Sequence, residues 1–498
     1  MIKEFPHEVK LVAFILLFKL LILALVPLTG DEAYFIKWAT HLSSGYYDHP
    51  PMVGWLIYLM SFVSESHIFF RLFSFMSAII VAFSIVNIAK LYMDEKKAFF
   101  LGLLFLASPV DILMSLFTND IPLVLFGTLG TQFLLYSFHK EKKITYALLS
   151  GLFLGAAFLS KYFVAFLLIS LLVFVFIVYK REAIKNVAIV AFIVLLAIAQ
   201  NLYFNYNCCW NNIMFNFFAR TESEYNFQTV TNFFLNLFYV ATPWALYFLY
   251  KCRKNFVNKE LFKLLSLILG FMFLIFFLVA LKNELGIHWF ILFVPYFFLL
   301  FSFLDDSYLK KLFTYNSIFT FIHIVVILSA LIALKTLPTS YLSKSYFYPD
   351  MLFADENKVV CANIETTENL FALGYTNASL LSYFCKKDIM MLFNDSKFGR
   401  FDDVLTDIRE LDGENVHLFN NRIIKTKELD NVCSKVTIDT FSIKNIPFYL
   451  ATCTGFNYQK YKNIHLQKQK DEFYTIPKWL PRGECYFDER YTFNESIK

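Results

Sequence analysis

A series of long apolar runs fills the first two thirds of this 498-residue chain and constrains its fold more than any other feature. In lipid the backbone can satisfy its own hydrogen bonds only as a helix or a closed barrel. These runs are too long and too uniformly apolar for barrel strands. They predict about eleven transmembrane helices, near residues 9–28, 68–91, 97–117, 120–138, 144–160, 162–179, 185–203, 229–250, 260–281, 287–304 and 316–336.

Basic residues fall on alternate connections between these predicted helices. The clusters are "MDEKK" (93–97), "HKEKK" (139–143), "YKREAIK" (179–185), "KCRKNFVNK" (251–259) and "LKK" (309–311). The positive-inside rule makes these connections and the Lys-bearing N-terminus cytoplasmic. The first run is interrupted by Lys19 and followed by further runs, so we interpret it as an uncleaved anchor. Because the Phe-, Ile-, Lys- and Asn-rich composition resembles that of low-GC bacteria, we expect a multi-pass inner-membrane protein whose C-terminal domain is periplasmic.

The composition changes near residue 340, where charged and polar residues return at ordinary density. We therefore expect a transmembrane domain, 1–339, with a long outer loop at 29–67, and a soluble α+β domain, 340–498. Within that loop, the apolar stretch 52–63 is too short to span a bilayer and is expected at the interface. In the tail, "KVVCANI", "VHLFNNRIIKT", "KVTIDTFSI" and "FYLATCTGF" predict strands, and "NASLLSYFCKK" predicts a helix.

The cysteines are informative by location. Seven of the eight lie on the predicted outer side, and Cys252 alone lies inside. An oxidising periplasm permits disulfides, for instance Cys453 with Cys485, but the sequence does not determine the pairing. The cysteine spacing contains no CxxC pattern, so we do not expect a zinc site built from these cysteines. The formal net charge of +5 is too small to indicate nucleic-acid binding.

Polar residues of unusual density follow the first apolar run. The stretch 30–52 contains Asp31, Glu32, Asp48 and His49 among aromatic residues. One interpretation is structural, since Asp31 stands where a helix N-cap would be. The turn "DHPP" is likewise open to a structural explanation, as a proline-fixed boundary between two interfacial helices.

The other predicted outer connections carry further charges. They hold Asp120, Lys161, Arg71, Arg220, and the group Lys282, Glu284 and His288. Each cation alone is better explained as an anchor that reaches for water at a helix end. Together they predict a cavity in which cations bind a phosphate and a carboxylate deprotonates a hydroxyl. Lipid-linked phosphosugars combine a phosphate with a membrane-embedded tail.

The motifs match a known family in order and spacing. "GDEAYF", "GYYDHPPMVGWLI", "RLFSFMSAII", "TNDIPLVLF" and "LSKYF" resemble the bacterial branch of the GT-C fold membrane glycosyltransferases (family 39-like). That branch is similar to the protein O-mannosyltransferases and to the aminoarabinose transferase that modifies lipid A. The match covers about the first 165 residues, and weaker similarity continues in "QNLYFNYNCCW", "NELGIHW", "GYTNASLLSYF" and "NDSKFGRFDD".

The resemblance implies roles for individual residues. Asp31 would be the general base, Glu32 its neighbour, and Asp120 the second acidic residue. His49 stands where the aminoarabinose transferase has a phosphate-binding lysine, and Asp48 stands where it has a glutamate. The loss of lysine charge at His49 puts that phosphate contact in doubt. The other cations expected at the donor phosphate are Arg71, Lys161 and Lys282.

Several further contacts are expected at the sugar or acceptor. Tyr34 and Tyr47 are interface-belt residues that could stack on a sugar. Glu284, His288 and Arg220 complete the set of expected contacts. No cofactor is required by this chemistry, because cationic side chains can stabilise the leaving phosphate. A divalent metal bound by Asp48 and His288 remains open.

The resulting hypothesis is an inverting glycosyltransferase that moves a sugar from a polyprenyl-phosphate-linked donor to an acceptor hydroxyl. The acceptor is a glycolipid such as lipid A, a glycan or a protein. The other expected partners are membrane lipids, and no nucleic acid is expected. A transporter or flippase for the same lipid is the alternative. Transporters place ionisable groups near the bilayer midplane and show inverted repeats, neither of which this sequence displays. A non-catalytic sensor would not need this many spans.

Overall fold

The computed structural model describes residues 4–219, 225–256, 258–343, 345, 348–365, 367–481 and 483–493. Its chain forms two compact units. The first contains residues 1–26, 60–200 and 223–331, and the second contains residues 27–59, 201–222 and 332–498. The second unit therefore gathers the tail with two segments that precede residue 339.

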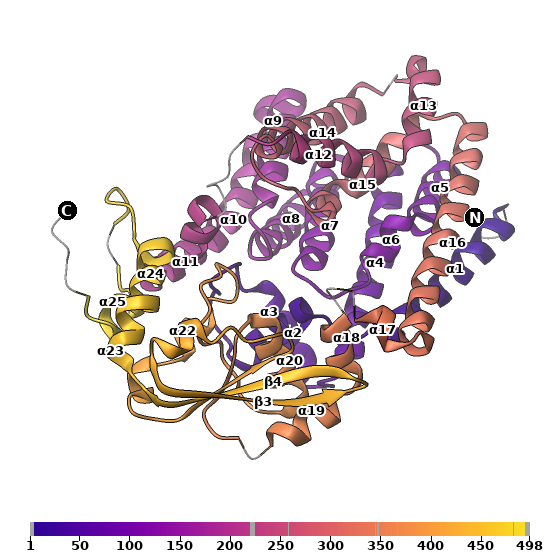
Figure 1. The fold of residues 1–498 in the computed structure, drawn as a ribbon. Coiled ribbons are helices and arrows are strands. Elements are labelled where there is room, and N and C mark those ends of the chain that lie inside the picture. Colours follow the sequence, from indigo (N-terminus) through magenta and orange to yellow (C-terminus); the bar gives the residue numbers. More distant parts are fainter. Residues whose placement is uncertain are drawn as a thin grey trace. The chain divides into compact units, whose positions relative to one another are not determined.

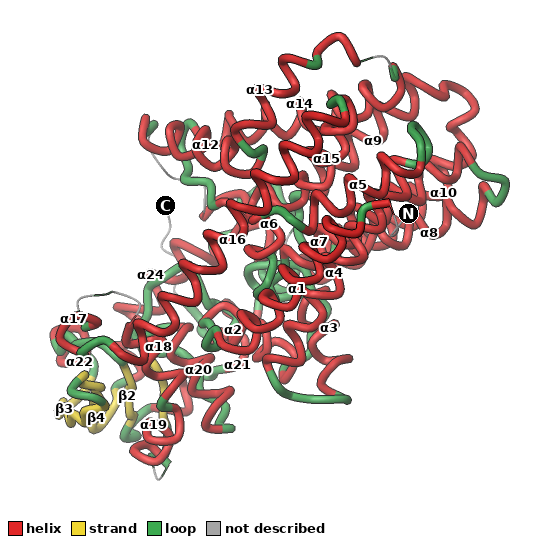
Figure 2. The backbone as a smooth tube through the Cα atoms, turned by 90° about the vertical axis from the view of Figure 1, so that its right-hand side faces the viewer, coloured by secondary structure: helices red, strands yellow, loops and turns green. Residues whose placement is uncertain are grey.

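The first unit is built from helices (Figures 1 and 2). They are α1 (Pro6–Leu25), α4 (His67–Ala89), α5 (Glu95–Leu106), α6 (Pro109–Leu113), α7 (Asp120–His139), α8 (Lys143–Phe158), α9 (Val164–Tyr179), α10 (Ala183–Asn207) up to residue 200, α12 (Phe227–Val240), α13 (Pro243–Lys251), α14 (Lys259–Ala280), α15 (Val294–Leu300) and α16 (Asp306–Thr336) up to residue 331. Every segment predicted to span the membrane is mainly helical, as hydropathy requires.

The predicted count of eleven spans is not confirmed. Within the described ranges, five helical runs are long and apolar enough to cross a membrane, or seven if each bent pair is one span. Proline explains two of the interruptions, because its ring blocks the preceding helical turn. Pro109 begins α6 after the break that ends α5, and Pro243 begins α13 after a 69° bend from α12.

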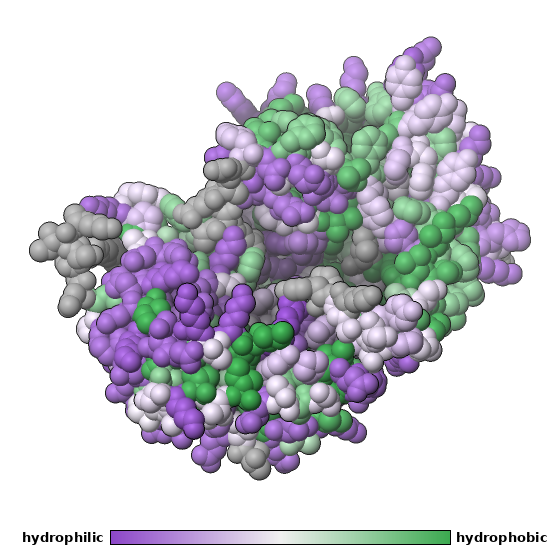
Figure 3. Space-filling view, viewed as in Figure 1, coloured by the Kyte–Doolittle hydropathy of each residue, from purple (hydrophilic) through white to green (hydrophobic). Residues whose placement is uncertain are grey.

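The helices of the first unit expose apolar side chains. On α16, the exposed residues include Ile318, Phe321, Val326 and others of the same kind. In Figure 3, hydrophobic side chains lie among paler ones on the side of the molecule where α16 runs, and hydrophilic side chains cover much of the tail. In a soluble protein such a surface would be buried, so α16 has the exterior expected of a lipid-facing helix.

The second unit contains a four-stranded sheet in the order β1-β2-β4-β3. The strands are β1 (Leu370–Ala372), β2 (Val416–Asn420), β3 (Cys433–Ile443) and β4 (Ile446–Phe456). β1 pairs with β2 in parallel, and the other pairs are antiparallel. Lys444 and Asn445 both have positive φ, the geometry of a tight two-residue hairpin turn, and join β3 to β4.

The tail predictions are confirmed at β2, β3, β4 and α20 (Tyr375–Cys385). The strand predicted at "KVVCANI" is wrong, because Asn357–Ile364 forms helix α19. Its β-branched residues favour a strand, but Val360 and Ile364, one helical turn apart, are both fully buried. Packing against the core therefore outweighs local strand propensity. The short strand β1 was not predicted.

The remaining elements of the second unit are mostly short helices. They are α2 (Gly30–Thr40), α3 (Met52–Ser61), α11 (Asn211–Ile213), the π-helix Met214–Ala219, α17 (Thr339–Leu342), α18 (Tyr348–Asp355), α21 (Asp402–Leu405), α22 (Lys427–Asp430), α23 (Tyr458–Tyr461), α24 (Gln467–Gln469) and α25 (Tyr486–Arg490). Leu28 and Ala33 belong to the same hydrophobic core as the sheet residues Phe419 and Phe448. Segment 27–59 is therefore an integral part of this unit.

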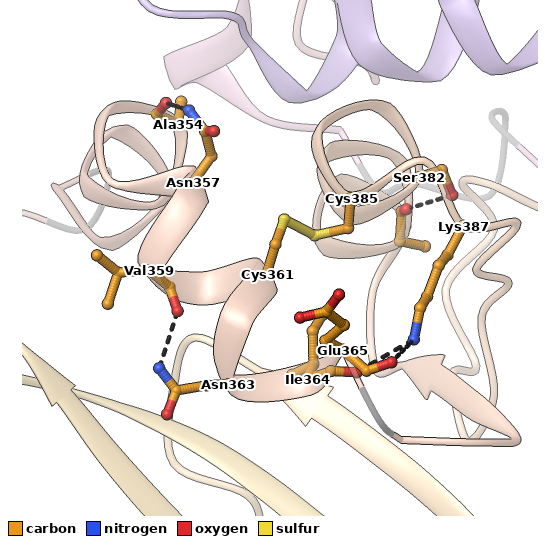
Figure 4. The surroundings of a disulfide bond; sticks show 11 residues. Ala354, Asn357, Val359, Cys361, Asn363, Ile364, Glu365, Ser382, Cys385 and Lys387 are labelled. Carbon is orange, nitrogen blue, oxygen red and sulfur yellow. Dashed lines mark hydrogen bonds between the residues drawn. A yellow bond between two sulfur atoms is a disulfide. The ribbon is translucent and has the colours of Figure 1, made fainter.

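Three disulfides hold the second unit together: Cys209–Cys485, Cys361–Cys385 and Cys433–Cys453. The suggested pair Cys453–Cys485 is therefore wrong, because antiparallel pairing brings the strand residues Cys433 and Cys453 close together. Figure 4 shows how Cys361–Cys385 joins α19 to α20, beside Lys387, whose ammonium donates to the carbonyls of Ile364 and Glu365.

Candidate active site

A capping box starts α2, the helix that carries the predicted base. Thr29 is the N-cap, and its Oγ1 accepts from the backbone N–H of Glu32 at 3.4 Å. The Glu32 carboxylate in turn accepts from the Thr29 backbone N–H at 3.3 Å and from its hydroxyl at 3.0 Å. The proposal that Asp31 is the N-cap is therefore wrong, since Thr29 and Glu32 close the first turn.

Asp31 and Glu32 have opposite environments although they are adjacent. Glu32 is buried by the capping box, whereas Asp31 in the same turn is exposed. The phenol of Tyr375 donates to Asp31 Oδ1 at 2.9 Å. Of the two neighbouring carboxylates, Asp31 is thus the one that a ligand can reach.

The segment with Asp48 and His49 forms a turn whose carbonyls are bound by asparagines. The Tyr46 N–H donates to the His49 carbonyl at 3.1 Å. The Asn212 amide donates to the carbonyls of Tyr46, Tyr47 (3.1 Å) and His49 (3.3 Å). Asn216 donates to the Asp48 carbonyl at 3.0 Å. The side-chain amides of Asn212 and Asn216 therefore satisfy backbone carbonyls of this turn that would otherwise be paired in secondary structure.

Tyr34 and Tyr47 are buried, at 4% and 1% exposure. Burial and then the nearby charge of Asp48 raise the pKa of Tyr34 well above its ordinary value. Burial likewise raises the pKa of Tyr47, whose ring lies 5.4 Å from that of Phe215. In this structure both tyrosines are packed within the second unit instead of offering an open face to a sugar.

Asp120 and Lys161 form a buried ion pair in the first unit. Lys161 Nζ lies 2.7 Å from Asp120 Oδ1, and each side chain is 6% exposed. Asp120 occupies the first position of α7, where the helix dipole favours a negative charge. The predicted second carboxylate and one of the predicted phosphate-binding lysines thus neutralise each other.

Arg71 is fully buried in α4. Its guanidinium donates to the carbonyls of Leu23 at 2.8 Å and Val26 at 2.6 Å, which end α1. It therefore satisfies carbonyls that a helix leaves without partners at its C-terminus.

The predicted group after α14 is exposed. Lys282 lies over the ring of Tyr225, with Nζ 4.9 Å from the centroid, and Glu284 accepts from Asn232 at 3.1 Å. His288 is also exposed, at the start of the 3₁₀ segment Ile287–Phe293. Arg220 lies outside the described residues. In the part of the chain that the structure describes, no three His, Cys, Asp or Glu side chains form a group suited to a metal.

Sequence reasoning missed the residues that hold these segments. Lys37, in the same stretch as Asp31, forms a buried ion pair with Asp402 at 2.7 Å. Tyr375 and Asn212 were not assigned roles. The dense asparagines of "QNLYFNYNCCWNNIMFN" were the sequence feature that could have predicted the role of Asn212. Buried amides need several hydrogen-bond partners, so such a cluster indicates a hydrogen-bonded contact with another segment.

Three comparisons place this geometry among known proteins. Residues 48–204 match the family model described as dolichyl-phosphate-mannose-protein mannosyltransferase. A lipid A galacturonosyltransferase, RgtD from Rhizobium johnstonii, is 28% identical over 181 residues, which span 35% of this chain and 38% of that protein. The match thus spans well under half of this curated relative.

Solved structures support the same fold. ArnT from Cupriavidus metallidurans bound to undecaprenyl phosphate has a TM-score of 0.64 at 14% identity, covering 89% of this chain and 97% of that one. The apo form has a TM-score of 0.63 at 13% identity over the same shares. The ArnT-like fold and the apolar helices make this a multi-pass membrane protein. In the sequence of residues 48–204 and in its fold, the chain is thus similar to the GT-C fold membrane glycosyltransferases.

Proposed function

We propose that this protein is an inverting glycosyltransferase that moves a sugar from a polyprenyl-phosphate donor to a hydroxyl of a lipid A-like glycolipid. The observation that carries the proposal is the exposed Asp31 carboxylate, in the first turn of a capped helix, within the family motif. Support for the donor comes from an ArnT structure that contains undecaprenyl phosphate, and support for the acceptor comes from the lipid A transferase relative.

The proposed reaction is a single displacement. Asp31 accepts the proton of the acceptor hydroxyl as that oxygen bonds to the anomeric carbon. The bond from the anomeric carbon to the phosphate oxygen breaks, and its electron pair leaves with the polyprenyl phosphate. Attack opposite the leaving group inverts the anomeric centre, and no glycosyl-enzyme intermediate forms.

The leaving phosphate needs cationic or hydrogen-bond-donating partners, which supply much of the rate enhancement in such reactions. Among the predicted cations, Arg71 and Lys161 are buried in contacts within the first unit, whereas Lys282 is exposed. Within the second unit we assign the phosphate contact to His49, and Lys282 of the first unit stays a predicted contact. We assign Glu32 to the capping box.

The proposed location of the tail is the periplasm. The three disulfides all lie in the second unit, and the clusters of basic residues lie on the opposite set of connections. Disulfides persist in oxidising compartments, and basic loops remain in the cytoplasm.

The test is a transfer assay with the full chain in nanodiscs. Radiolabelled polyprenyl-phosphate sugars from native membranes are mixed with lipid, polysaccharide and protein fractions of the same membranes. Wild type is expected to label the lipid fraction, and Asp31→Asn to lower the rate by about 10²–10⁴-fold. Asp306→Asn, at an exposed carboxylate of α16, is the matched control.

Each part of the proposal has its own contrary outcome. Label in the polysaccharide or protein fraction refutes the lipid acceptor, and normal transfer by Asp31→Asn refutes the base. An unchanged anomeric configuration refutes single displacement. Binding of the donor without any transfer supports a transporter.

A further inference from the structure

The first turn of α2 packs against the first turn of α20, which lies more than three hundred residues later in the chain (Figure 1). A Cβ at Gly30 would lie 2.5 Å from the methyl group of Thr376, so a larger residue here would force the Thr376 side chain to shift. The rings of Tyr34 and Tyr375 meet edge to face, with centroids 5.4 Å apart. The two helix starts are therefore in direct contact.

This contact places the Tyr375 hydroxyl against the Asp31 carboxylate. The phenol oxygen lies 2.9 Å from Asp31 Oδ1. The Tyr375 side chain is half-buried, and Asp31 is exposed. Burial and then the Asp31 charge raise the pKa of Tyr375, so the phenol remains protonated and donates this hydrogen bond.

Two further contacts hold α2 along its length. Lys37 donates to Asp402 at 2.7 Å and to the Ile389 carbonyl at 2.9 Å, and both ionic side chains are 2% exposed. At the end of the helix, His41 lies 2.9 Å from Asp388. Since α2 is held at both its middle and its end, its first turn has little freedom to move away from Tyr375.

We infer that Tyr375 is a positioning residue that holds the Asp31 carboxylate in one orientation, with Oδ1 bound and Oδ2 available to the acceptor hydroxyl. This inference rests on the proposed function. A carboxylate on an exposed first turn would otherwise sample several rotamers, of which one suits proton transfer. The tail thus contributes directly to the reacting group.

The test compares Tyr375→Phe with wild type in the full-length protein. Phenylalanine keeps the ring contact with Tyr34 and removes the donor. We expect kcat to fall about 10-fold to 100-fold while the KM for the donor lipid is unchanged, since misplacing a reacting group costs rate without donor affinity. Tyr383→Phe, which alters another half-buried tyrosine of α20, is the matched control.

A double-mutant cycle separates positioning from a general structural effect. In the Asp31→Asn background, Tyr375→Phe is expected to cause no further loss of kcat. Thermal unfolding of the same four proteins (wild type, both single variants and the double variant) reports whether the two side chains are energetically coupled, and it does not depend on catalytic activity.

The outcomes distinguish the two proposals. If wild type transfers sugar and Tyr375→Phe matches it, the inference is overturned and the proposed function stands. Equal rate losses from Tyr375→Phe with and without Asp31 also overturn it. If wild type transfers nothing although the unfolding cycle shows coupling, the proposed function fails, and the role of Tyr375 in transfer fails with it.

Discussion

Lys161 and Asp120 are joined by a 2.7 Å ion pair in which both side chains are almost completely buried. The pair links the N-terminus of α7 to the connection between α8 and α9. Burial of two charges is costly, but removal of one partner is worse, because the other then lacks its counter-charge.

Lys161→Met is therefore expected to destabilise the protein by about 3–5 kcal/mol. The double variant Lys161→Met with Asp120→Leu should recover most of that loss, since it leaves no unpaired charge. Thermal unfolding in detergent measures both. Lys143→Met, at an exposed lysine of α8, is the control, and a Lys161→Met variant as stable as this control would contradict the expectation.

Asn212 is expected to be essential for the turn at residues 46–49. Its amide donates to three carbonyls of the turn, and its own oxygen accepts from Asn201 at 3.1 Å. Asn212→Asp replaces the donor by a carboxylate that faces those carbonyls, at a cost of about 1–3 kcal/mol. Thermal unfolding and limited proteolysis should both report the loss, whereas Asn207→Asp should be much milder. Equal behaviour of the two variants would exclude this role.

Asp395 is expected to make stability depend on acid pH. The hydrogen bond from His465, followed by that from Lys468, outweighs burial and lowers the pKa of Asp395 from 3.8 to about 2. A lowered carboxyl pKa adds stability that is complete above the unfolded value and is lost as the pH falls towards 2. The shift corresponds to about 2 kcal/mol.

Unfolding measured between pH 6 and pH 2 should therefore show a steeper acid loss for wild type than for Asp395→Asn. Asp439→Asn, on the exposed face of β3, should retain the wild-type slope. Identical slopes for wild type and Asp395→Asn would show that this carboxylate has no such role.

The disulfide pairing predicts three cross-linked peptides in mass spectrometry of unreduced protein. Reduction of Cys209–Cys485 should destabilise the second unit most, because 276 residues separate the two cysteines, against 24 and 20 for the other pairs. Chain-entropy estimates give on the order of 5 kcal/mol for so long a loop. Separate Cys-to-Ala pairs compared by thermal unfolding test the ranking, and recovery of a Cys453–Cys485 peptide would contradict it.

Hydropathy was sufficient to predict the helical segments, because burial in lipid constrains every residue of a span. It did not predict where those segments break. Pro109 and Pro243 interrupt runs whose composition is otherwise continuous. In the tail, alternating patterns predicted β3 and β4, but "KVVCANI" was mistaken for a strand, since its helical burial at Val360 and Ile364 depends on neighbours distant in sequence.

The same division applies to the candidate site. The motif around Asp31 was sufficient to nominate the base, but it did not show that Thr29, two residues before Asp31, would be the helix cap. Nor could it show that Glu32 would turn back to close the helix while Asp31 stayed exposed. Which residue caps the helix depends on backbone N–H groups of its first turn, and more than one neighbouring side chain, Thr29 or Asp31, is of a type that can accept from them.

The amino-acid sequence by itself determined the helical membrane part, the mixed tail and the segment that carries Asp31. Hydropathy and short motifs act within a few residues, so they can be recognised without knowing the path of the chain. Only the tertiary structure decided that Tyr375 binds Asp31 and that Asp402 binds Lys37. Those partners lie 344 and 365 residues apart, and such pairs form only when packing brings the two elements together.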